Sequence, residues 1–515
     1  MLRFLLEAGP NTWRLARVAA TFRKTGAMEK VLEAFDAPAR LRIPLMIVTA
    51  PGLLVGERGD SSLPPVARAI NALGPAYIKL GQILSTRPDV IGVDLARDMR
   101  TLQDALPPFP MAEARKAVRD ALGRDVEELF EEFGPPVAAA SIAQVHQAID
   151  RETGRKVAVK ILRPHIERQF RKDIAAFYMI AKLMELLDPR AKRLRPRAVV
   201  EHFEGVVTAE MDLRLEASAA AEFAHNVAGD PGFKVPEIIW PLSDRRVMTA
   251  SWVDGLPMGD PEALAAAGHD LVALAERIIQ TFLMQALRDG FWHGDMHQGN
   301  LKVAANGDIL ALDFGIMGRI DRVTRRYYAE ILLGFLRKDY HRVAEVHFEA
   351  GYVPADKDVD QFAQALRSIG EPIFGQAASR ISMARLLAHL FEVTERFGMV
   401  TQTQLILLQR SMVVVEGVAR SLDPNANIWS AAGPVVERWM RDNLGPHAVL
   451  RDAAVAARTL SRLGPRLPEL AERLVRMADA KEPPPPPPRR RWRSALWLLV
   501  GAAAGAGLTW IALTQ

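Results

Sequence analysis

The stretch HGDMHQGN at residues 293–300, followed by LDFG at residues 312–315, decides the fold of this 515-residue chain. The first stretch places Asp295 five residues before Asn300. The apolar run at 309–313 predicts a short β-strand between the two. An Asp-Phe-Gly tripeptide alone is weak evidence because it arises by chance, so the inference depends on the order and spacing of both stretches.

This order and spacing are typical of the catalytic loop and metal-binding loop of protein kinases. Phosphoryl transfer requires neutralised charge and aligned atoms more than covalent chemistry. Asn300 and Asp313 can hold Mg²⁺, and Asp295 can orient an attacking hydroxyl group. Upstream, Val-Ala-Val-Lys at 157–160 predicts a strand on which Lys160 faces away from the valines, where it can hold ATP phosphates. The sequence therefore predicts an ATP and Mg²⁺ site.

A zinc site is the alternative for the same loop. His293, Asp295 and His297 alternate in a pattern that can supply metal ligands. Zinc binding explains neither Lys160 nor the Asp-Phe-Gly stretch. We therefore expect His293 to brace the loop through a hydrogen bond instead.

The segment before Lys160 carries alanines where an ordinary kinase has a glycine-rich phosphate loop. Residues 138–146 are Ala-Ala-Ala-Ser-Ile-Ala-Gln-Val-His. Alanine does not adopt the positive φ that lets glycine backbone fold closely over phosphates, so we expect a different nucleotide pose or selectivity. The residues predicted to contact the nucleotide here are Ala138, Ala139, Ala140, Ser141, Ile142, Ala143 and Gln144.

Two further motifs complete a family resemblance. Lys-Leu-Gly-Gln at 79–82 follows Pro75, which predicts the start of a helix, and Glu-Met-Asp occupies 210–212. With the alanine-rich loop and the kinase-like motifs, residues 60–420 resemble the UbiB family of atypical protein-kinase-like proteins, which is linked to ubiquinone biosynthesis.

The resemblance implies roles for further residues. Glu216 looks like the helix glutamate that pairs with Lys160, and we expect Asp212 and Glu216 to share one helix face. The helix of the Lys-x-Gly-Gln motif is expected to cover the site at which a kinase receives its peptide, which favours ATP hydrolysis or a small lipid-like substrate. The expected occluding or regulatory residues are Lys79, Gln82, Glu210 and Asp212.

Composition excludes several classes of protein. The chain has no cysteine, which excludes disulfides, thiolate zinc sites, iron–sulfur clusters and a cysteine nucleophile. The net charge of +5 comes from the ends, because residues 1–30 and 481–493 each carry +4 while 31–480 carry −3. This distribution speaks against a nucleic-acid partner. Without a GxGxxG fingerprint, we also find no support for a flavin- or nicotinamide-dependent hydroxylase.

The C-terminal end predicts a membrane anchor. Residues 495–513 are uncharged and mostly apolar, and a helix of this length spans about 28 Å, close to the hydrocarbon thickness. Six prolines at 483–488 and four arginines within 489–493 precede it, which predicts a single pass through a bacterial-type inner membrane with the large domain in the cytoplasm. Gly501 and Gly505 allow a homodimer through this helix.

The N-terminal end allows two interpretations. Apolar and basic residues interleave over residues 4–24, as in an amphipathic helix on an anionic membrane. The same pattern fits a helix that packs its apolar face against the protein. The apolar run at 41–55 is too short, and contains two prolines, for a second span.

The expected fold class is α+β: an atypical protein-kinase-like, two-lobed fold with family-specific N-terminal helices and one C-terminal transmembrane helix. Strands are predicted at 137–140, 157–162, 235–240 and 247–253, with one long helix over 198–226 and mostly helices after 269. The expected segments are 1–60, an N-terminal amphipathic or helical region; 61–135, a helical extension; 136–255, an N-lobe; 256–420, a C-lobe; 421–482, C-terminal helices; 483–493, a linker; and 494–515, the membrane helix.

These inferences favour a membrane-anchored kinase or ATPase that binds Mg-ATP and supports ubiquinone biosynthesis. The expected partners are membrane lipids, polyprenylated ubiquinone precursors and ubiquinone-biosynthesis enzymes. Two alternatives stay open: a small-molecule phosphotransferase, and a non-catalytic nucleotide-binding scaffold of a biosynthetic complex. The sequence does not identify the phosphate acceptor, the ubiquinone intermediate, the oligomeric state or the role of residues 421–480.

Overall fold

The structure is a computed structural model. It describes residues 2–35, 39–50, 52–85, 91–99, 101–102, 106–187, 195–374, 389, 392–399 and 402–445. The chain divides into a first compact unit, 1–440, and a second, 441–515, which lies almost wholly outside the described residues.

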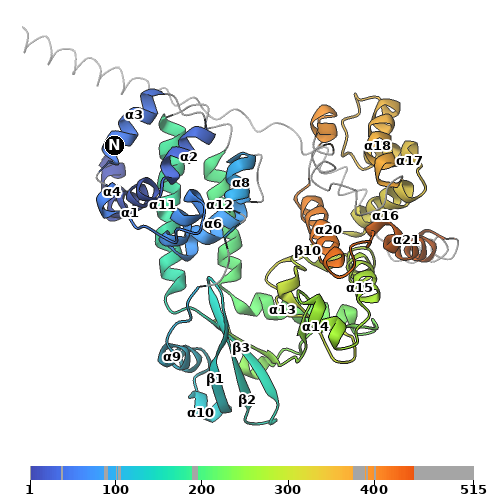
Figure 1. The fold of residues 1–515 in the computed structure, drawn as a ribbon, viewed down its shortest axis with the longest axis horizontal. Coiled ribbons are helices and arrows are strands. Elements are labelled where there is room, and N and C mark those ends of the chain that lie inside the picture. Colours follow the sequence, from blue (N-terminus) through green and yellow to red (C-terminus); the bar gives the residue numbers. More distant parts are fainter. Residues whose placement is uncertain are drawn as a thin grey trace, which may run out of the picture. The chain divides into compact units, whose positions relative to one another are not determined.

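An N-terminal group of helices precedes the kinase-like part (Figure 1). These helices are α1 (Leu2–Thr25), α2 (Ala27–Ala34), α3 (Ala39–Val48), α4 (Gly52–Val55), α5 (Pro65–Leu73), α6 (Pro75–Ser85) and α8 (Val93–Met99). They share a core with two helices from later in the chain, α11 (Ile166–Leu187) and α12 (Pro196–Glu210), through buried residues such as Ile78, Phe170 and Phe203. As predicted, Pro75 begins α6, since proline at the first helical position sacrifices no hydrogen bond.

Helix α1 packs on the protein itself over its described side chains. Val18 and Phe22 lie partly buried against the core of the N-terminal helices, and Arg14 pairs with Asp173 of α11 at 3.4 Å. Of the two interpretations of the N-terminus, the structure therefore shows the packed helix for residues 14–25. Val18 and Phe22, on the apolar face of this part of the helix, pack against the protein and not toward solvent.

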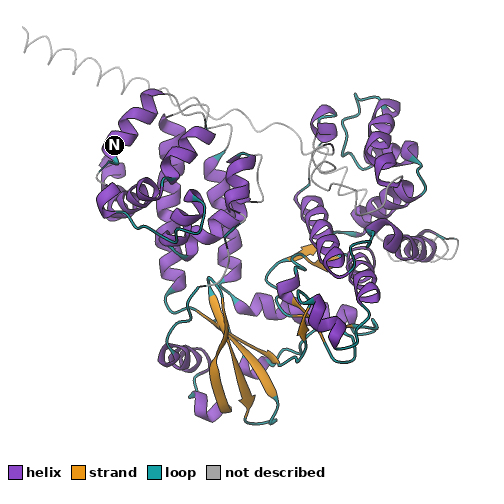
Figure 2. Ribbon diagram, in the orientation of Figure 1, coloured by secondary structure: helices purple, strands orange, loops and turns teal. Residues whose placement is uncertain are grey.

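A four-stranded antiparallel sheet forms the smaller lobe (Figure 2). Its strands are β1 (Phe130–Ala139), β2 (Ala143–Asp150), β3 (Lys156–Leu162) and β5 (Val247–Ser251), in the order β1-β2-β3-β5, and α9 (Met111–Leu122) and α10 (Val126–Leu129) precede them. The predicted alternation in β3 is confirmed, because Val157, Val159 and Ile161 are fully buried while Lys160 lies on the other face.

Two strand predictions are wrong. Strand β2 was not predicted, and β1 begins at Phe130 and not at the predicted residue 137. The predicted strand 235–240 does not form: the short strand β4 (Phe233–Lys234) ends before it, and within it there is one isolated bridge, from Ile238 to Ala250. The reason is proline: Pro236 and Pro241 have no N–H to donate to a ladder, and a 3₁₀ turn begins at Trp240.

The long helix predicted over 198–226 is two helices. Helix α12 ends at Glu210 and α13 (Leu213–Val227) begins three residues later. Asp212 lies outside both with φ −123°, and its side chain accepts a hydrogen bond from the Arg214 N–H, as at a helix N-terminus. The Leu213 N–H donates to the Arg245 carbonyl at 2.9 Å instead of continuing α12.

The larger lobe is mostly helical. Its helices are α14 (Pro261–Ala266), α15 (Leu271–Met284), α16 (Arg322–Leu336), α17 (Tyr340–Glu349), α18 (Val359–Phe374), α20 (Thr403–Leu422) and α21 (Ile428–Leu444). The short strands are β6 (Leu256–Pro257), β7 (Phe291–His293), β8 (Leu301–Val303), β9 (Ile309–Ala311) and β10 (Met317–Arg319), which pair as β10-β7 and β4-β9-β8-β6. Of these, only the strand around 309–311 was predicted.

Within the described part of the chain, no helix is long and apolar enough to cross a membrane. The predicted linker 483–493, the predicted membrane helix 494–515 and its glycine pair lie outside the described residues. The C-terminal helices expected over 421–482 are described only as far as residue 445, by the end of α20 and by α21.

A glycine in β10 predicts a measurable stability effect. A Cβ atom at Gly318 would lie 2.1 Å from the ring of Trp292, the fully buried residue opposite it in β7. We expect Gly318→Ala to destabilise the protein by at least about 1–3 kcal/mol through overpacking, seen as a lower midpoint of thermal unfolding. The matched control is Gly205→Ala in α12, where a Cβ meets nothing within 4 Å and which should be neutral or stabilising. Equal midpoints for the two variants would contradict the packing.

Candidate active site

A lysine between two carboxylates forms the centre of the candidate site. The Nζ atom of Lys160 in β3 lies 2.6 Å from Oε1 of Glu216 in α13 and 3.2 Å from Oδ2 of Asp313. Glu216 is almost buried, with 9% of its side chain exposed, whereas Asp313 keeps 46% exposed. The structure thus brings together three predicted site residues, and it leaves one carboxylate open toward solvent.

Lys160 stabilises the charge of each carboxylate and is stabilised by both, whereas Asp313 acts against the charge of Glu216. Burial acts to lower the pKa of Lys160, but the charges of Asp313 and Glu216 outweigh it and raise that pKa, so the side chain stays an ammonium group. Burial acts against the charge on Asp313 too, yet Lys160 and the Gly315 N–H hold its pKa below the ordinary value. Burial raises the pKa of Glu216 against the opposing effect of Lys160.

A β-hairpin brings the two predicted metal ligands together. Strands β8 and β9 pair with Leu301 opposite Ala311, and the Leu312 N–H donates to the Asn300 carbonyl at 3.0 Å. Asn300 and Asp313 therefore lie at the same end of the hairpin. Asp313 Oδ1 accepts a hydrogen bond from the Gly315 N–H at 2.9 Å, which fixes the Asp-Phe-Gly turn.

Internal hydrogen bonds hold the loop 293–300 in place. The Asp295 N–H donates to Nδ1 of the fully buried His293 at 3.1 Å, and Asn300 Nδ2 donates to the Asp295 carbonyl at 3.1 Å. Because Nδ1 of His293 accepts, its neutral ring carries the proton on Nε2. Burial lowers the pKa of His293 and keeps the ring neutral. His293 thus braces the loop through a backbone hydrogen bond.

His297 makes a similar bond, in which its Nδ1 accepts from the Gly299 N–H at 3.0 Å. Among the residues that the structure describes, no three His, Cys, Asp or Glu side chains are grouped so that they could hold a metal ion. The zinc alternative therefore has no geometric support in the described part of the chain.

The alanine-rich segment forms a tight turn between β1 and β2. The strands end and begin at Ala139 and Ala143, and the Ala140 N–H donates to the Ala143 carbonyl at 2.8 Å. Ser141, at the tip, is fully buried, and its Oγ has no hydrogen-bond partner within the described structure. A buried hydroxyl group without a partner is costly, so this atom fits a bound acceptor such as a phosphate oxygen.

Gln144 lies apart from the other predicted loop contacts. It is buried in β2, where its Oε1 accepts from the Phe109 N–H at 2.9 Å and its Nε2 lies 2.8 Å from Nε2 of His146. These contacts give Gln144 a structural place inside the smaller lobe. The remaining set fits ATP and Mg²⁺: Lys160 and Ser141 offer donors, and Asp313 and Asn300 offer oxygen ligands.

A second ion pair joins the other two family motifs. Lys79 Nζ in α6 lies 3.0 Å from Oε2 of Glu210, at the end of α12, with 14% and 10% of the side chains exposed. Gly81 lets α6 pack closely, since a Cβ there would lie 2.5 Å from the Leu102 side chain. Gln82 lies half-buried on the same helix.

Asp212 does not join the Lys79 pair. Its carboxylate pairs with the Arg214 guanidinium at 2.7 Å and caps α13, the helix that carries Glu216 in its first turn. Glu210 alone of the two carboxylates in the motif pairs with Lys79.

Sequence reasoning missed a residue that supports the loop from α20. The Oγ atom of the fully buried Ser411 lies 2.9 Å from the Gly294 carbonyl, to which it can donate, and accepts from Trp292 Nε1 at 3.3 Å. The Gln285 side chain likewise accepts from the His293 N–H at 3.4 Å. Ser411 is 117 residues from Gly294, and the one local signal is a serine inside an apolar helix.

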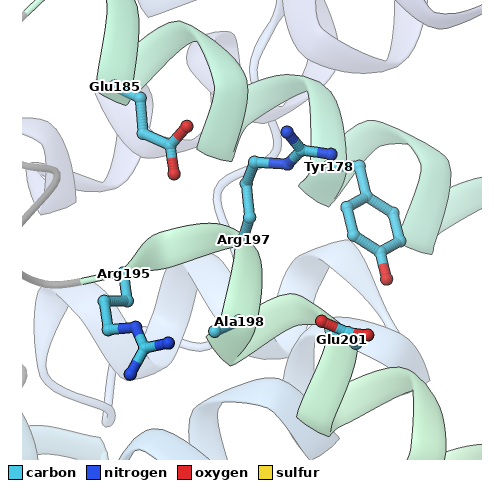
Figure 3. Close-up of a pocket in the computed structure, with 6 residues that line it drawn as sticks. All are labelled: Tyr178, Glu185, Arg195, Arg197, Ala198 and Glu201. Atoms are coloured by element: carbon cyan, nitrogen blue, oxygen red, sulfur yellow. The ribbon is translucent and has the colours of Figure 1, made fainter. Parts of the chain in front are cut away.

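A surface depression of about 600 Å³ lies between α11 and α12 (Figure 3). It is lined by Tyr178, Glu185, Arg195, Arg197, Ala198 and Glu201. None of the predicted site residues lines it, so it is separate from the candidate site.

Comparisons with known proteins identify related domains and proteins. The sequence profile of the ABC1 atypical kinase-like domain matches residues 101–347, and that of the UbiB helical domain matches residues 366–427. A protein of Marinobacter nauticus named "Probable protein kinase UbiB" is 37% identical over 467 residues, covering 89% of this chain and 84% of that protein. A solved complex of Rv3197 of Mycobacterium tuberculosis with erythromycin is 24% identical and has a TM-score of 0.49, covering 77% of this chain and 97% of that one.

The two profile matches and the related protein together identify the family. The chain belongs to the UbiB family of atypical kinase-like proteins.

Proposed function

We propose that this chain binds Mg-ATP at the Lys160 site and acts as an ATPase or phosphotransferase. The observation that carries the proposal is the placement of Lys160 between Glu216 and Asp313, from three distant segments of the chain. Bound ATP with Mg²⁺ would supply the transferable phosphoryl group and its charge neutralisation. A purely structural ion pair would not need Asn300 beside Asp313 or the unpartnered Ser141 hydroxyl near the start of β2.

Each side chain has a distinct task in this proposal. The Lys160 ammonium attracts phosphate oxygens, and Glu216 fixes its position from the buried side. Asp313 and the Asn300 side-chain oxygen hold the metal ion. Asp295 orients the acceptor hydroxyl group or water, in a loop held by His293.

For the biological role, we propose support of ubiquinone biosynthesis at a bacterial inner membrane. The family resemblance suggests membrane-embedded polyprenyl intermediates, or the enzymes that modify them, as targets. The apolar segment 494–515 would anchor the chain with its kinase-like part in the cytoplasm, and Gly501 and Gly505 would allow pairing of two such helices. The family resemblance implies that α6 covers the acceptor side of the site, where the Lys79–Glu210 pair would hold it, and this favours water or a lipid over a protein as acceptor.

Loss of the metal-ligand charge tests the proposed reaction. We expect Asp313→Asn in the full chain to lower Mg-dependent ATP turnover by about 100-fold or more, because the variant lacks the carboxylate that neutralises charge at the metal. The control is Asp308→Asn, the same change in the loop between β8 and β9, where Asp308 bonds only within the turn in the described structure. ATP hydrolysis is measured in vesicles with and without a ubiquinone-precursor phenol. Unchanged turnover in Asp313→Asn would refute the assignment, and silence of the unaltered protein that still binds nucleotide would favour the scaffold.

The contact between Glu216 and Lys160 predicts that a change of Glu216 weakens nucleotide binding. Glu216→Gln replaces a charge-assisted hydrogen bond with a neutral one, so the Lys160 ammonium loses its fixed position. We expect the dissociation constant of Mg-ADP to rise about tenfold, measured by calorimetry. Glu222→Gln on the same helix, where Glu222 pairs with Arg319 at the surface, should leave it unchanged. If Glu216→Gln and Glu222→Gln bound Mg-ADP with the same dissociation constant, Lys160 would not be the phosphate contact.

The second ion pair predicts a coupled stability effect. Because Lys79 and Glu210 are mostly buried, Lys79→Met should destabilise the fold by about 3 kcal/mol by leaving a buried carboxylate. The double variant Lys79→Met/Glu210→Met should recover part of this loss. Arg214→Met, which breaks the more exposed pair with Asp212, should cost less than about 1 kcal/mol. Thermal unfolding measures all three, and strict additivity in the double variant would rule out the coupling.

A further inference from the structure

The segment that contains α3 and α4 leaves large apolar side chains in solvent. Ile47 is 67% exposed, Leu54 84% and Val55 77%. Ile43, Leu45 and Leu53 are exposed as well. Soluble proteins rarely leave so many neighbouring apolar groups in water unless the surface binds something. We call these six exposed residues, Ile43, Leu45, Ile47, Leu53, Leu54 and Val55, the apolar tip.

The directions of these side chains select the kind of partner. Consecutive residues of a helix point about 100° apart, so Leu53, Leu54 and Val55 cannot all face one flat surface. Ile43 and Leu45 likewise point to nearly opposite sides of α3. A groove on a protein covers one side of a helix, whereas lipid chains can surround it. Exposure on several sides therefore favours a bilayer as the occupant.

The charges around the apolar tip select the kind of lipid. Residues 39–55 contain Arg40 and Arg42 and no Asp or Glu. The Lys24 ammonium donates to the Leu53 carbonyl, which places a cation beside the exposed turn of α4. Cations at the edge of an apolar wedge are complementary to anionic lipid headgroups.

The first carboxylate after α4 in the sequence is neutralised, since Glu57 pairs with Arg17 of α1 at 2.8 Å. Helix α4 is held against α1 (Figure 1), which packs on the core of the N-terminal helices. The Thr49 hydroxyl group at the end of α3 is satisfied within the protein, because it donates to the Leu45 carbonyl at 2.6 Å. The α4 part of the apolar tip is thus held in place by helices that pack on the core of the N-terminal region.

We propose that the apolar tip inserts into the surface of an anionic lipid bilayer. This contact goes beyond the proposed anchor at 494–515, because it would fix a second point of the protein on the membrane and so set the orientation of the kinase-like part. Insertion of the apolar tip does not depend on bound nucleotide or on Asp313 of the candidate active site.

The absence of cysteine makes the test direct. Leu54→Cys in the full chain is labelled with an environment-sensitive fluorophore and reconstituted in nanodiscs of phosphatidylcholine and phosphatidylglycerol. We expect emission at shorter wavelength and strong quenching when the lipids carry brominated acyl chains. The control is Val323→Cys in α16, which has 61% exposure and should remain unquenched. Arg42→Glu, added to Leu54→Cys, should weaken the quenching, and so should discs of phosphatidylcholine alone.

Two results would overturn the proposal. Equal, unquenched emission from the Leu54 and Val323 labels means that the tip stays in water. Short-wavelength emission without quenching by brominated lipid means that protein covers the tip, either a second copy or another segment of this chain. The readout is fluorescence and not ATP turnover. A negative fluorescence result therefore does not refute the proposed ATPase activity, and a lack of ATPase activity does not refute membrane insertion of the apolar tip.

Discussion

The buried ammonium of Lys160 is the constraint on which the rest of the structure depends. A cation taken out of water must be paired, because its desolvation cost exceeds what packing can return. Glu216 meets this need from the protein side and Asp313 from the open side. These contacts tie together a strand of the smaller lobe, helix α13 and the Asp-Phe-Gly turn, whose positions along the chain differ by 56 and 153 residues from Lys160.

The unequal exposure of the two carboxylates gives the triad its chemistry. Glu216 is enclosed, so it is suited to hold the lysine permanently. Asp313 keeps nearly half of its side chain exposed, so it can turn toward a metal ion without uncovering an unpaired cation. The supporting contacts lie behind the loop 293–300, where His293 and Ser411 bond to backbone atoms and never occupy the open side.

Local spacing explains which parts of this site were predictable. Lys160, Asp295, Asn300 and Asp313 stand in motifs whose intervals follow from one strand and one hairpin. The Gln144 contacts and the support from Ser411 join residues 35 and 117 positions apart, and no local pattern records such distances. Strands of two or three residues, such as β7 and β8, exist only because a partner strand lies beside them. The failed strand at 235–240 had a local cause in its prolines, which the apolar pattern concealed.

The break between α12 and α13 links the two ion pairs. Glu210 at the end of α12 meets Lys79, and Glu216 in the first turn of α13 meets Lys160. In one continuous helix, these glutamates would lie about 240° apart around the axis, and their directions would be fixed by that helix alone. Asp212 interrupts the helix by capping α13, and each glutamate is then placed by its own helix. The short segment 210–216 therefore connects the residue that pairs with the motif helix α6 to the residue that holds Lys160.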